Sequence, residues 1–261
     1  MQAGQAQPAT DALFDPVGTP VEAEVPALVR RALEHGRARI ALQPVRATGG
    51  GRTMFHEALL RLTDGSGVVL SAAQFMPWVE DGPLGRQLDI AALRLGLSWL
   101  ERNPGHRLSI NLSGRSLSDA AWRHTLEDWL ARTPEDGVRL ILEMTEASAM
   151  RDPDATRTFM TRMQPRGPCF ALDDFGAGTM APSEVGEFLF DMVKIDRRFA
   201  AGIDRMANRR AAVRDLVAVA RDLDLTVIAQ GVEYPAEAEI FAALGVDGLQ
   251  GYLIGRPDLG A

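Results

Sequence analysis

The sequence predicts a (β/α)8 barrel of the TIM type whose first strand runs antiparallel to the second. Three observations support this fold class: eight short apolar runs, amphipathic stretches between the later runs, and a short glycine-rich connection, Thr48–Arg52, between the first two. Alternating strands and helices are typical of a parallel sheet. The connection Thr48–Arg52 is too short for a helical crossover, so we expect the first two strands to form a hairpin.

The predicted strands, in chain order, are 39–45, 54–62, 107–112, 138–144, 169–173, 191–195, 225–229 and 248–254. The predicted helices include 84–102, 119–132 and 204–222, with Asp119 and Asp204 as N-caps and Gly245 as a C-terminal stop of the last helix. An open doubly wound sheet is the alternative architecture. It would require a glycine-rich phosphate loop that opens a helix after an early strand, and the sequence contains none.

Composition excludes several classes of protein. The 261 residues are 46% hydrophobic and 24% charged, which suffices for a sizeable core. A single cysteine, Cys169, excludes an intrachain disulfide framework. No apolar run approaches the roughly 20 residues of a membrane span, and the first basic residue is Arg30, which disfavours a secretory signal. We therefore expect a cytoplasmic protein with no membrane insertion. The net charge of −7 disfavours binding of long nucleic acids.

The chain divides into two parts by composition. Residues 1–25 are rich in Ala, Gln, Pro and Gly and lack a sustained period, which predicts a flexible N-terminal leader. Residues 26–261 carry the alternating pattern and form the predicted barrel domain. Within this domain Lys194 is the only lysine among 28 basic residues, and it lies in the apolar segment Met192–Asp196. Either this is chance, or the position requires a compact ammonium that arginine cannot replace.

Polar side chains interrupt the predicted strands near their carboxyl ends. In a barrel these ends meet at one mouth, where the active sites of this architecture lie. Carboxylates that converge there require a cation, and oxygen ligands without a Cys or His cluster favour Mg²⁺ or Mn²⁺. Taken one at a time, each residue also fits a helix cap, a turn or a surface ion pair. The residues are Glu57, Asn111, Glu143, Asp173, Asp174, Lys194, Gln230, Glu233 and Gln250.

Two adjacent aspartates, Asp173 and Asp174, can bridge a pair of divalent ions about 3.5–4 Å apart. Two such ions would balance the four carboxylates of Glu57, Glu143, Asp173 and Asp174. A neutral metal pair beside the cations of Lys194 and Arg61 would attract a phosphate ester. The residues alone therefore indicate metal-assisted hydrolysis of a phosphodiester by an activated water.

The segment Glu57-Ala-Leu-Leu-Arg61 resembles the signature of EAL domains, bacterial phosphodiesterases that act on cyclic di-GMP. The resemblance extends from about Arg39 to Pro257. It implies a barrel with an antiparallel first strand and hydrolysis of one phosphodiester to linear pGpG. The further matching segments are Gln43-Pro44, Asn111-Leu-Ser113, Leu142-Glu-Met-Thr-Glu146, Asp173-Asp-Phe-Gly176, Val193-Lys-Ile-Asp196, Gly231-Val-Glu233 and Gln250-Gly-Tyr-Leu253.

The resemblance also implies roles for individual residues and for partners. One Mg²⁺ or Mn²⁺ ion is expected and a second is an option, with cyclic di-GMP as substrate, a homodimer as the assembly, and a regulatory protein or domain as a further partner. Lys194 would orient or help activate the attacking water, Glu146 would hold the loop after the fifth strand, and Glu233 would support the site near Lys194. The implied metal ligands are Glu57, Asn111, Glu143 and Asp173, with Asp174 assisting the second ion, and the implied dinucleotide contacts are Gln43, Leu59, Arg61 and Gln250.

Two positions depart from the family pattern. Gln230 stands where the family has a glutamate, which removes a negative charge and predicts weaker binding of the second ion. The loop after the fifth strand reads Ala177-Gly-Thr-Met-Ala-Pro-Ser183 instead of the usual Thr-Gly-Tyr-Ser-Ser continuation. Two functions therefore stay open: a cyclic di-GMP phosphodiesterase of reduced activity, or an inactive receptor that binds cyclic di-GMP and signals to a protein partner.

Overall fold

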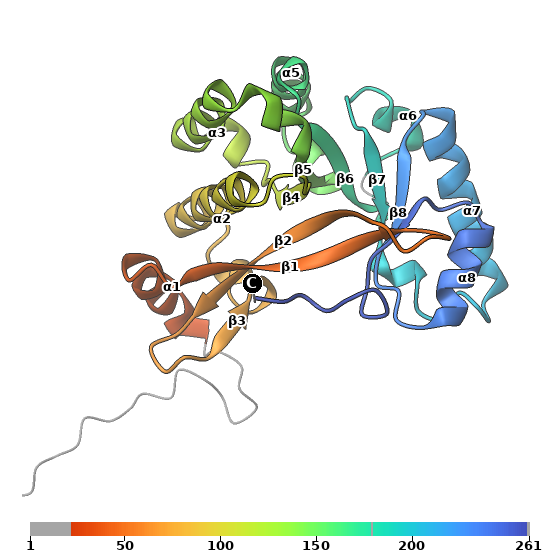
Figure 1. The fold of residues 1–261 in the computed structure, drawn as a ribbon, viewed down its shortest axis with the longest axis horizontal. Helices are drawn as coiled ribbons and strands as arrows, with labels where there is room; N and C mark the ends of the chain where they lie inside the picture. Colours follow the sequence, from red (N-terminus) through yellow and green to blue (C-terminus); the bar gives the residue numbers. More distant parts are fainter. Residues whose placement is uncertain (1–21, 179, 260–261) are drawn as a thin grey trace, which may run out of the picture.

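A computed structural model describes residues 22–178 and 180–259 of the chain. Most of the predicted leader, residues 1–21, lies outside the described residues, and residues 22–25 are helical. The described residues form a barrel of strands surrounded by helices (Figure 1). Among these residues no helix has both the length and the apolar character needed to cross a membrane.

The strands confirm the predicted barrel and its antiparallel start. β1 pairs with β2 in antiparallel register, with Gln43 opposite Glu57, and each later strand from β4 to β9 adds in parallel. The ring closes because β1 pairs with β9 on its other side. The strands are β1 (Ala38–Ala47), β2 (Thr53–Thr63), β3 (Val69–Ser71), β4 (Leu108–Asn111), β5 (Leu140–Thr145), β6 (Cys169–Phe175), β7 (Met192–Ile195), β8 (Thr226–Ala229) and β9 (Gly248–Leu249).

Five predicted strands are longer than the observed ones, two of them by at least two residues at one end, and one strand was not predicted. β5 begins at Leu140 because residues 134–139 form a 3-10 helix. β9 ends at Leu249 because the chain turns there, with the N–H of Ile254 donating to the carbonyl of Gly251. The unpredicted strand, β3, is three residues long and pairs with the outer edge of β2, with Ser71 opposite Arg61.

The helices cover the outside of the ring in the order of the strands (Figure 1). The α-helices are α1 (Val25–Glu34), α2 (Pro83–Arg102), α3 (Ala120–Arg132), α4 (Glu146–Met150), α5 (Pro153–Met163), α6 (Pro182–Val185), α7 (Ala207–Asp222) and α8 (Pro235–Ala243). Short 3-10 helices are η1 (Glu22–Glu24), η2 (Ala72–Gln74), η3 (Met76–Trp78), η4 (Ser116–Ser118), η5 (Pro134–Arg139), η6 (Gln164–Arg166) and η7 (Arg197–Phe199).

The predicted helix boundaries are correct at two places and wrong at one. Asp119 caps α3, since its Oδ1 accepts the N–H of Trp122 at 2.9 Å, and Gly245 follows α8 with φ +85. Asp204 does not cap α7, whose N-cap is Met206. The reason is a tight turn before the helix, in which the N–H groups of Arg205 and Met206 donate to the carbonyl of Gly202.

The barrel interior begins with an apolar layer contributed by six strands. Because side chains alternate between the two faces of a strand, residues two positions further along each strand share the inward face. This layer therefore fixes which residues face inward above it. Its buried members are Val45, Phe55, Ile141, Ala171, Met192 and Ile228.

Candidate active site

A layer of polar side chains lies two residues beyond the apolar layer, toward the carboxyl ends of the strands. Four strands contribute to both layers and Gln230 directly follows a fifth strand, β8, so the same alternation that builds the core also directs the polar groups into the barrel. The polar residues and their apolar predecessors are Glu57 after Phe55, Glu143 after Ile141, Asp173 after Ala171, Lys194 after Met192 and Gln230 after Ile228.

Lys194 lies at the centre of this layer, fully buried. Its Nζ donates to Glu57 Oε2 at 2.8 Å and to Glu143 Oε2 at 2.6 Å, and lies 3.6 Å from Asp173 Oδ1. Burial opposes its charge, but the carboxylates of Asp173, Glu143 and Glu57 hold the pKa of Lys194 well above its ordinary value. The structure therefore brings together four residues that are as many as 137 positions apart in sequence.

The pKa values of the three carboxyl groups around Lys194 are shifted in different directions. Burial, with the neighbouring carboxylates of Glu57 and Asp173, raises the pKa of Glu143 to about 8. Burial likewise raises the pKa of Asp173 to about 6. Glu57 keeps a lowered pKa despite its burial, because Lys194 and hydrogen bonds from Gln250 and Asn111 stabilise its charge. One ammonium thus does not neutralise three buried carboxylates. A further cation in this layer would stabilise the charged form of these carboxylates.

The donor atoms of this layer fit a hard divalent cation. Glu143 Oε1 and Gln250 Oε1 are buried without a hydrogen-bond partner, and Asn111 lies beside Glu57, to which its Nδ2 donates at 3.2 Å. Carboxylate and carboxamide oxygens are the ligands that Mg²⁺ and Mn²⁺ prefer. Within residues 22–178 and 180–259, no three His, Cys, Asp or Glu residues surround a common point that could hold a metal. The Nζ of Lys194 lies within 3.6 Å of an oxygen of each of Glu57, Glu143 and Asp173.

Three glutamines extend the hydrogen bonding around the carboxylates. Gln250 Nε2 donates to Glu57 Oε2 at 2.6 Å and to Gln43 Oε1 at 3.2 Å, while Gln43 Nε2 donates to the carbonyl of Gly255 at 3.0 Å. Gln230 Nε2 donates to Asp173 Oδ1 at 2.8 Å. The neutral amide of Gln230 therefore occupies a carboxylate oxygen that would otherwise be open to a cation.

Asp174 has an unusual backbone conformation. Its φ of +55 lies in the left-handed region, and the pairing of β6 with β7 is irregular between Leu172 and Phe175. Such a conformation costs a non-glycine residue about 1 kcal/mol or more and is concentrated at functional sites. Burial and the nearby carboxylate of Asp196 raise the pKa of Asp174. The irregularity allows Asp174 to border the pocket while Asp173 faces Lys194.

Glu146, at the start of α4, contacts the loop that follows β6. Its carboxylate accepts the N–H of Gly176 at 2.9 Å and the N–H of Met180 at 3.1 Å. The side chain is buried. These contacts attach the loop to the element that follows β5.

The polar layer opens into a pocket of about 450 Å³ at the carboxyl ends of the strands. Glu57 and Gln230 belong to both the layer and the pocket wall, and Gln250, which donates to Glu57, also lies on the wall. Glu233 borders the pocket with an exposed side chain, and in the described chain its carboxylate makes no hydrogen bond or ion pair with Lys194. The remaining sequence-predicted residues on the wall are Gln43, Leu59, Arg61 and Asp174.

Several wall residues were not predicted from the sequence: Ser71, Ala72, Ala73, Arg197, Gly231, Gly251, Tyr252 and Pro257. Ser71 ends β3, the strand that the hydrophobic pattern did not indicate, and Ala72 and Ala73 follow it in η2. Arg197 carried a usable signal, because it is a cation two residues after the end of a strand that already bears Lys194.

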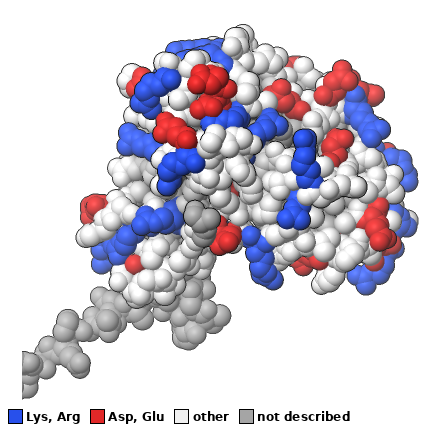
Figure 2. Space-filling model, viewed as in Figure 1, with Lys and Arg blue, Asp and Glu red and all other residues white. Residues whose placement is uncertain are grey.

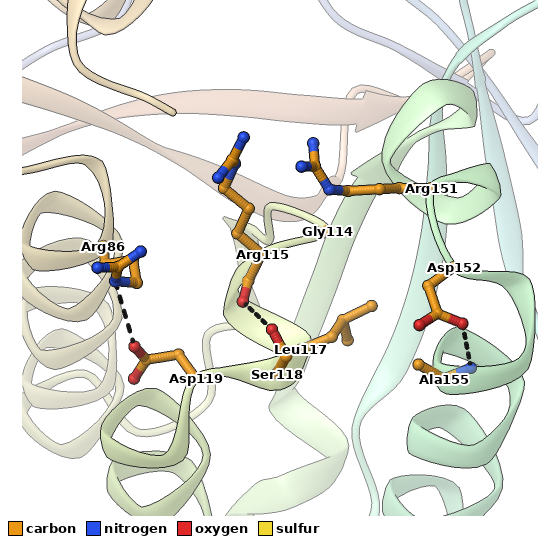
Figure 3. Close-up of a pocket in the computed structure, with 9 residues that line it drawn as sticks. All are labelled: Arg86, Gly114, Arg115, Leu117, Ser118, Asp119, Arg151, Asp152 and Ala155. Carbon is orange, nitrogen blue, oxygen red and sulfur yellow. Dashed lines mark hydrogen bonds and ion pairs between the residues drawn. The ribbon is translucent and has the colours of Figure 1, made fainter. Parts of the chain in front are cut away.

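A second cavity, of about 490 Å³, lies between α2, α3 and α5 (Figure 3). Figure 3 shows Arg86 directed at Asp119, with 3.8 Å between Nε and Oδ2, and Asp152 directed at the N–H of Ala155. Arg115, also on its wall, pairs with Asp81. These charges are partly exposed and mostly compensated by neighbours, so the larger cavity offers no buried excess of charge.

Comparisons with known proteins agree with the geometry. The model of the EAL domain matches residues 27–257. The chain is 32% identical over 237 residues to the bifunctional diguanylate cyclase/cyclic di-GMP phosphodiesterase MucR of Pseudomonas aeruginosa, covering 88% of this chain and 34% of that protein. It is 30% identical over 233 residues to the cyclic di-GMP phosphodiesterase PdeF of Escherichia coli, covering 88% and 31%. The chain thus spans about a third of the length of these curated relatives.

Solved structures show the same barrel. The phosphodiesterase PaMucR in complex with c-di-GMP has a TM-score of 0.80 at 30% identity, over 90% of this chain and 97% of that one. The FimX EAL domain from Pseudomonas aeruginosa bound to c-di-GMP has a TM-score of 0.83 at 21% identity, over 91% and 97%, which supports the fold alone.

Proposed function

Because the chain belongs to the EAL domain family, we propose that it is a metal-dependent phosphodiesterase that hydrolyses one phosphodiester bond of cyclic di-GMP to give linear pGpG. The observation that carries this proposal is the buried cluster of Lys194 with Glu57, Glu143 and Asp173, which opens into a pocket of about 450 Å³. Relatives with about 30% identity that carry the names of cyclic di-GMP phosphodiesterases support the choice of substrate.

The cluster supplies the chemistry that the reaction needs. Glu57, Asn111, Glu143 and Asp173 would hold Mg²⁺ or Mn²⁺, with Asp174 assisting a second ion; a bound ion polarises the phosphoryl oxygen and acidifies a water. Lys194 contributes a fixed positive charge and N–H donors that orient the attacking water. Gln43, Leu59, Arg61 and Gln250 border the pocket and would contact the dinucleotide.

Gln230 is the reason to propose reduced activity. Its amide donates to Asp173 Oδ1, so it adds no negative charge and competes for an oxygen that a second ion would use. Affinity for hard cations rises with the number of charged ligands. We therefore expect a weakly bound second ion and slow turnover.

The test is incubation of the purified protein with cyclic di-GMP and Mg²⁺ or Mn²⁺, with pGpG followed by chromatography. Product formation that stops in the Glu57→Gln variant and on addition of a chelator supports the proposal. Absence of product with both metals, in a protein that still binds the dinucleotide, contradicts it. That second outcome favours the alternative function, an inactive cyclic di-GMP receptor that signals to a protein partner.

The substitution Gln230→Glu separates these two functions. It replaces the amide with a carboxylate beside Asp173 Oδ1, 2.8 Å from the present Nε2. If the missing charge limits the second ion, turnover should rise by about tenfold or more and the metal concentration needed for half-maximal rate should fall. An unchanged rate would refute the second-metal explanation.

A homodimer and a regulatory domain or protein partner complete the proposal. The chain spans about a third of its curated relatives, which leaves room for regulatory modules in proteins of this kind. Analytical ultracentrifugation with and without cyclic di-GMP tests the homodimer, which predicts a sedimentation coefficient above that of a 28.3 kDa monomer.

A further inference from the structure

Arg197 places a cationic side chain at the edge of the pocket, where its charge opposes the raised pKa of Asp174 on the same wall. It begins η7, two residues after the end of β7, its side chain is exposed, and it borders the pocket. In the part of the chain that the structure describes, its guanidinium makes no hydrogen bond and no ion pair. Its neighbour Arg198 does, since its Nε lies 3.0 Å from Asp196 Oδ2. The two adjacent arginines therefore differ in their contacts. Arg198 pairs with Asp196, whereas the guanidinium of Arg197 is available to a ligand.

The backbone of Arg197 is held in place from two sides. Gly231, with φ +71, packs against it so closely that a Cβ on Gly231 would lie 2.7 Å from the Cβ of Arg197. On the other side Asp196 caps the turn, because its Oδ1 accepts the N–H of Arg198 at 2.7 Å. The backbone at the pocket edge is thus fixed, which lowers the entropic cost of binding to that of ordering the side chain alone.

Arg61 and Arg197 lie on opposite sides of the barrel mouth. The closed ring runs β1, β2, β4, β5, β6, β7, β8, β9, so β2, which carries Arg61, and β7, which precedes Arg197, are four strands apart in either direction. Both arginines border the same pocket. A ligand that fills this pocket therefore passes between two guanidinium groups.

A cyclic dinucleotide has two phosphodiester groups on opposite sides of its ring, each with one negative charge. The carboxylates of Asp174 and Glu233 on the same wall would repel this dianion unless cations offset them. We propose that Arg197 binds one phosphodiester group of the cyclic dinucleotide, across the pocket from Arg61. This inference rests on the proposed function and adds to it a residue that binds the substrate. Guanidinium groups suit this task because they pair bidentately with phosphate oxygens.

The test is titration calorimetry of cyclic di-GMP into the protein at several salt concentrations, with a chelator to prevent turnover. We compare the wild type with Arg197→Gln, Arg197→Lys and, as a matched control from the same turn, Arg198→Gln. Arg197→Gln should weaken binding by about tenfold or more, as expected for the loss of a charge-assisted hydrogen bond. It should also lower the slope of log affinity against log salt by about one. Arg197→Lys should restore the slope, and Arg198→Gln should bind within about twofold of the wild type.

The outcomes separate this inference from the proposed function. If the wild type binds and Arg197→Gln binds equally well with an unchanged salt slope, the role of Arg197 is refuted and the function stands. If the wild type binds no cyclic di-GMP with chelator, Mg²⁺ or Mn²⁺, the proposed function is refuted, and this inference with it. Thermal unfolding of each variant identifies a merely structural effect: a loss of affinity in Arg197→Gln that comes with a large fall in melting temperature, absent in Arg197→Lys, would also refute a phosphate contact.

Discussion

The two cavities beside the barrel are of similar size, and they hold their charges in different ways. In the larger one, Arg86 pairs with Asp119 and Arg115 with Asp81, and each pair includes a side chain that is at least 40% exposed. Below the smaller one, Lys194 and Glu143 are fully buried and three carboxyl groups share one ammonium. Arginine and acidic side chains are similarly interspersed over the face shown in Figure 2.

The volumes of the two cavities do not distinguish them, but the burial of their charges does. Exposed ion pairs are screened by water and contribute little energy, so their arrangement is only loosely determined. A buried excess of negative charge is costly, and a fold retains it only where surrounding interactions compensate for it. The polar layer around Lys194 is therefore the region where substitutions should have the largest effects, and the arginines of the larger cavity should have the smallest.

The largest effect should come from Lys194→Met, which keeps the length of the side chain and removes its charge. Three carboxyl groups would then share the buried layer without a cation, as Lys194 is the partner of each. At pH 8 without metal, the free energy of unfolding should fall by about 3–5 kcal/mol, and activity should be lost. Denaturant unfolding measures the first effect and pGpG formation the second. A variant as stable as the wild type would show that the layer is not under electrostatic strain.

Glu143→Gln should separate stability from activity in the same layer. The pKa of Glu143 is raised from 4.5 to about 8, so between these values the folded protein retains a proton that the unfolded chain releases. The free energy of unfolding of the metal-free protein should therefore decrease as the pH rises from about 5 to 8. Glutamine does not titrate and resembles the protonated acid, so the variant should lose less stability over this range while it loses activity.

Denaturant unfolding at pH 5, 6, 7 and 8 in the presence of a chelator tests this prediction. Asp128→Asn, at an exposed carboxylate paired with His124 on α3, is a matched control that should follow the wild type. Parallel curves for the wild type and Glu143→Gln would contradict the raised pKa.

Much of this contrast was visible in the sequence. The alternation along each strand places Glu57, Glu143, Asp173 and Lys194 on the inward face. Because the carboxyl ends of parallel barrel strands lie at the same end of the barrel, these residues meet there. The inward orientation follows from the local periodicity, and the shared position at one end of the barrel follows from the fold class. The N-cap Asp119 was equally local, since its carboxylate bonds to a backbone N–H three residues away.

Other features depend on contacts that no local pattern contains. Asp204 has the residue type of an N-cap, but a turn around Gly202 delays the start of α7 to Ala207. β3 is too short to show an alternating hydrophobic pattern. It forms because its backbone pairs with the edge of β2. The bond from Gln230 to Asp173 joins residues 57 positions apart, so its competition with a cation became visible only in the folded chain.

An intermediate effect is expected at Asp119, which belongs to the larger cavity but has a local structural role. Its Oδ1 caps α3 through the N–H of Trp122, and Trp122 is buried. Asp119→Ala should lower the free energy of unfolding by about 1 kcal/mol, the usual value of an N-cap, and leave activity unchanged. Asp119→Asn keeps an acceptor oxygen and should retain most of the stability, which denaturant unfolding of both variants measures. Equal losses in the two variants would assign the effect to the ion pair with Arg86 instead of the cap.

The smallest effects are expected for Arg86→Gln and Arg115→Gln. The side chains of Arg86 and Arg115 are 43% and 29% exposed, and each pairs with one acidic residue. The partner of Arg115, Asp81, is 79% exposed. Water and salt screen such pairs, and the entropy lost in ordering long side chains offsets most of the attraction. Each substitution should change the free energy of unfolding by less than about 0.5 kcal/mol and leave the rate of pGpG formation within about twofold. A loss of activity comparable to that of Lys194→Met would reverse the comparison, because it would mean that the larger cavity takes part in binding or catalysis.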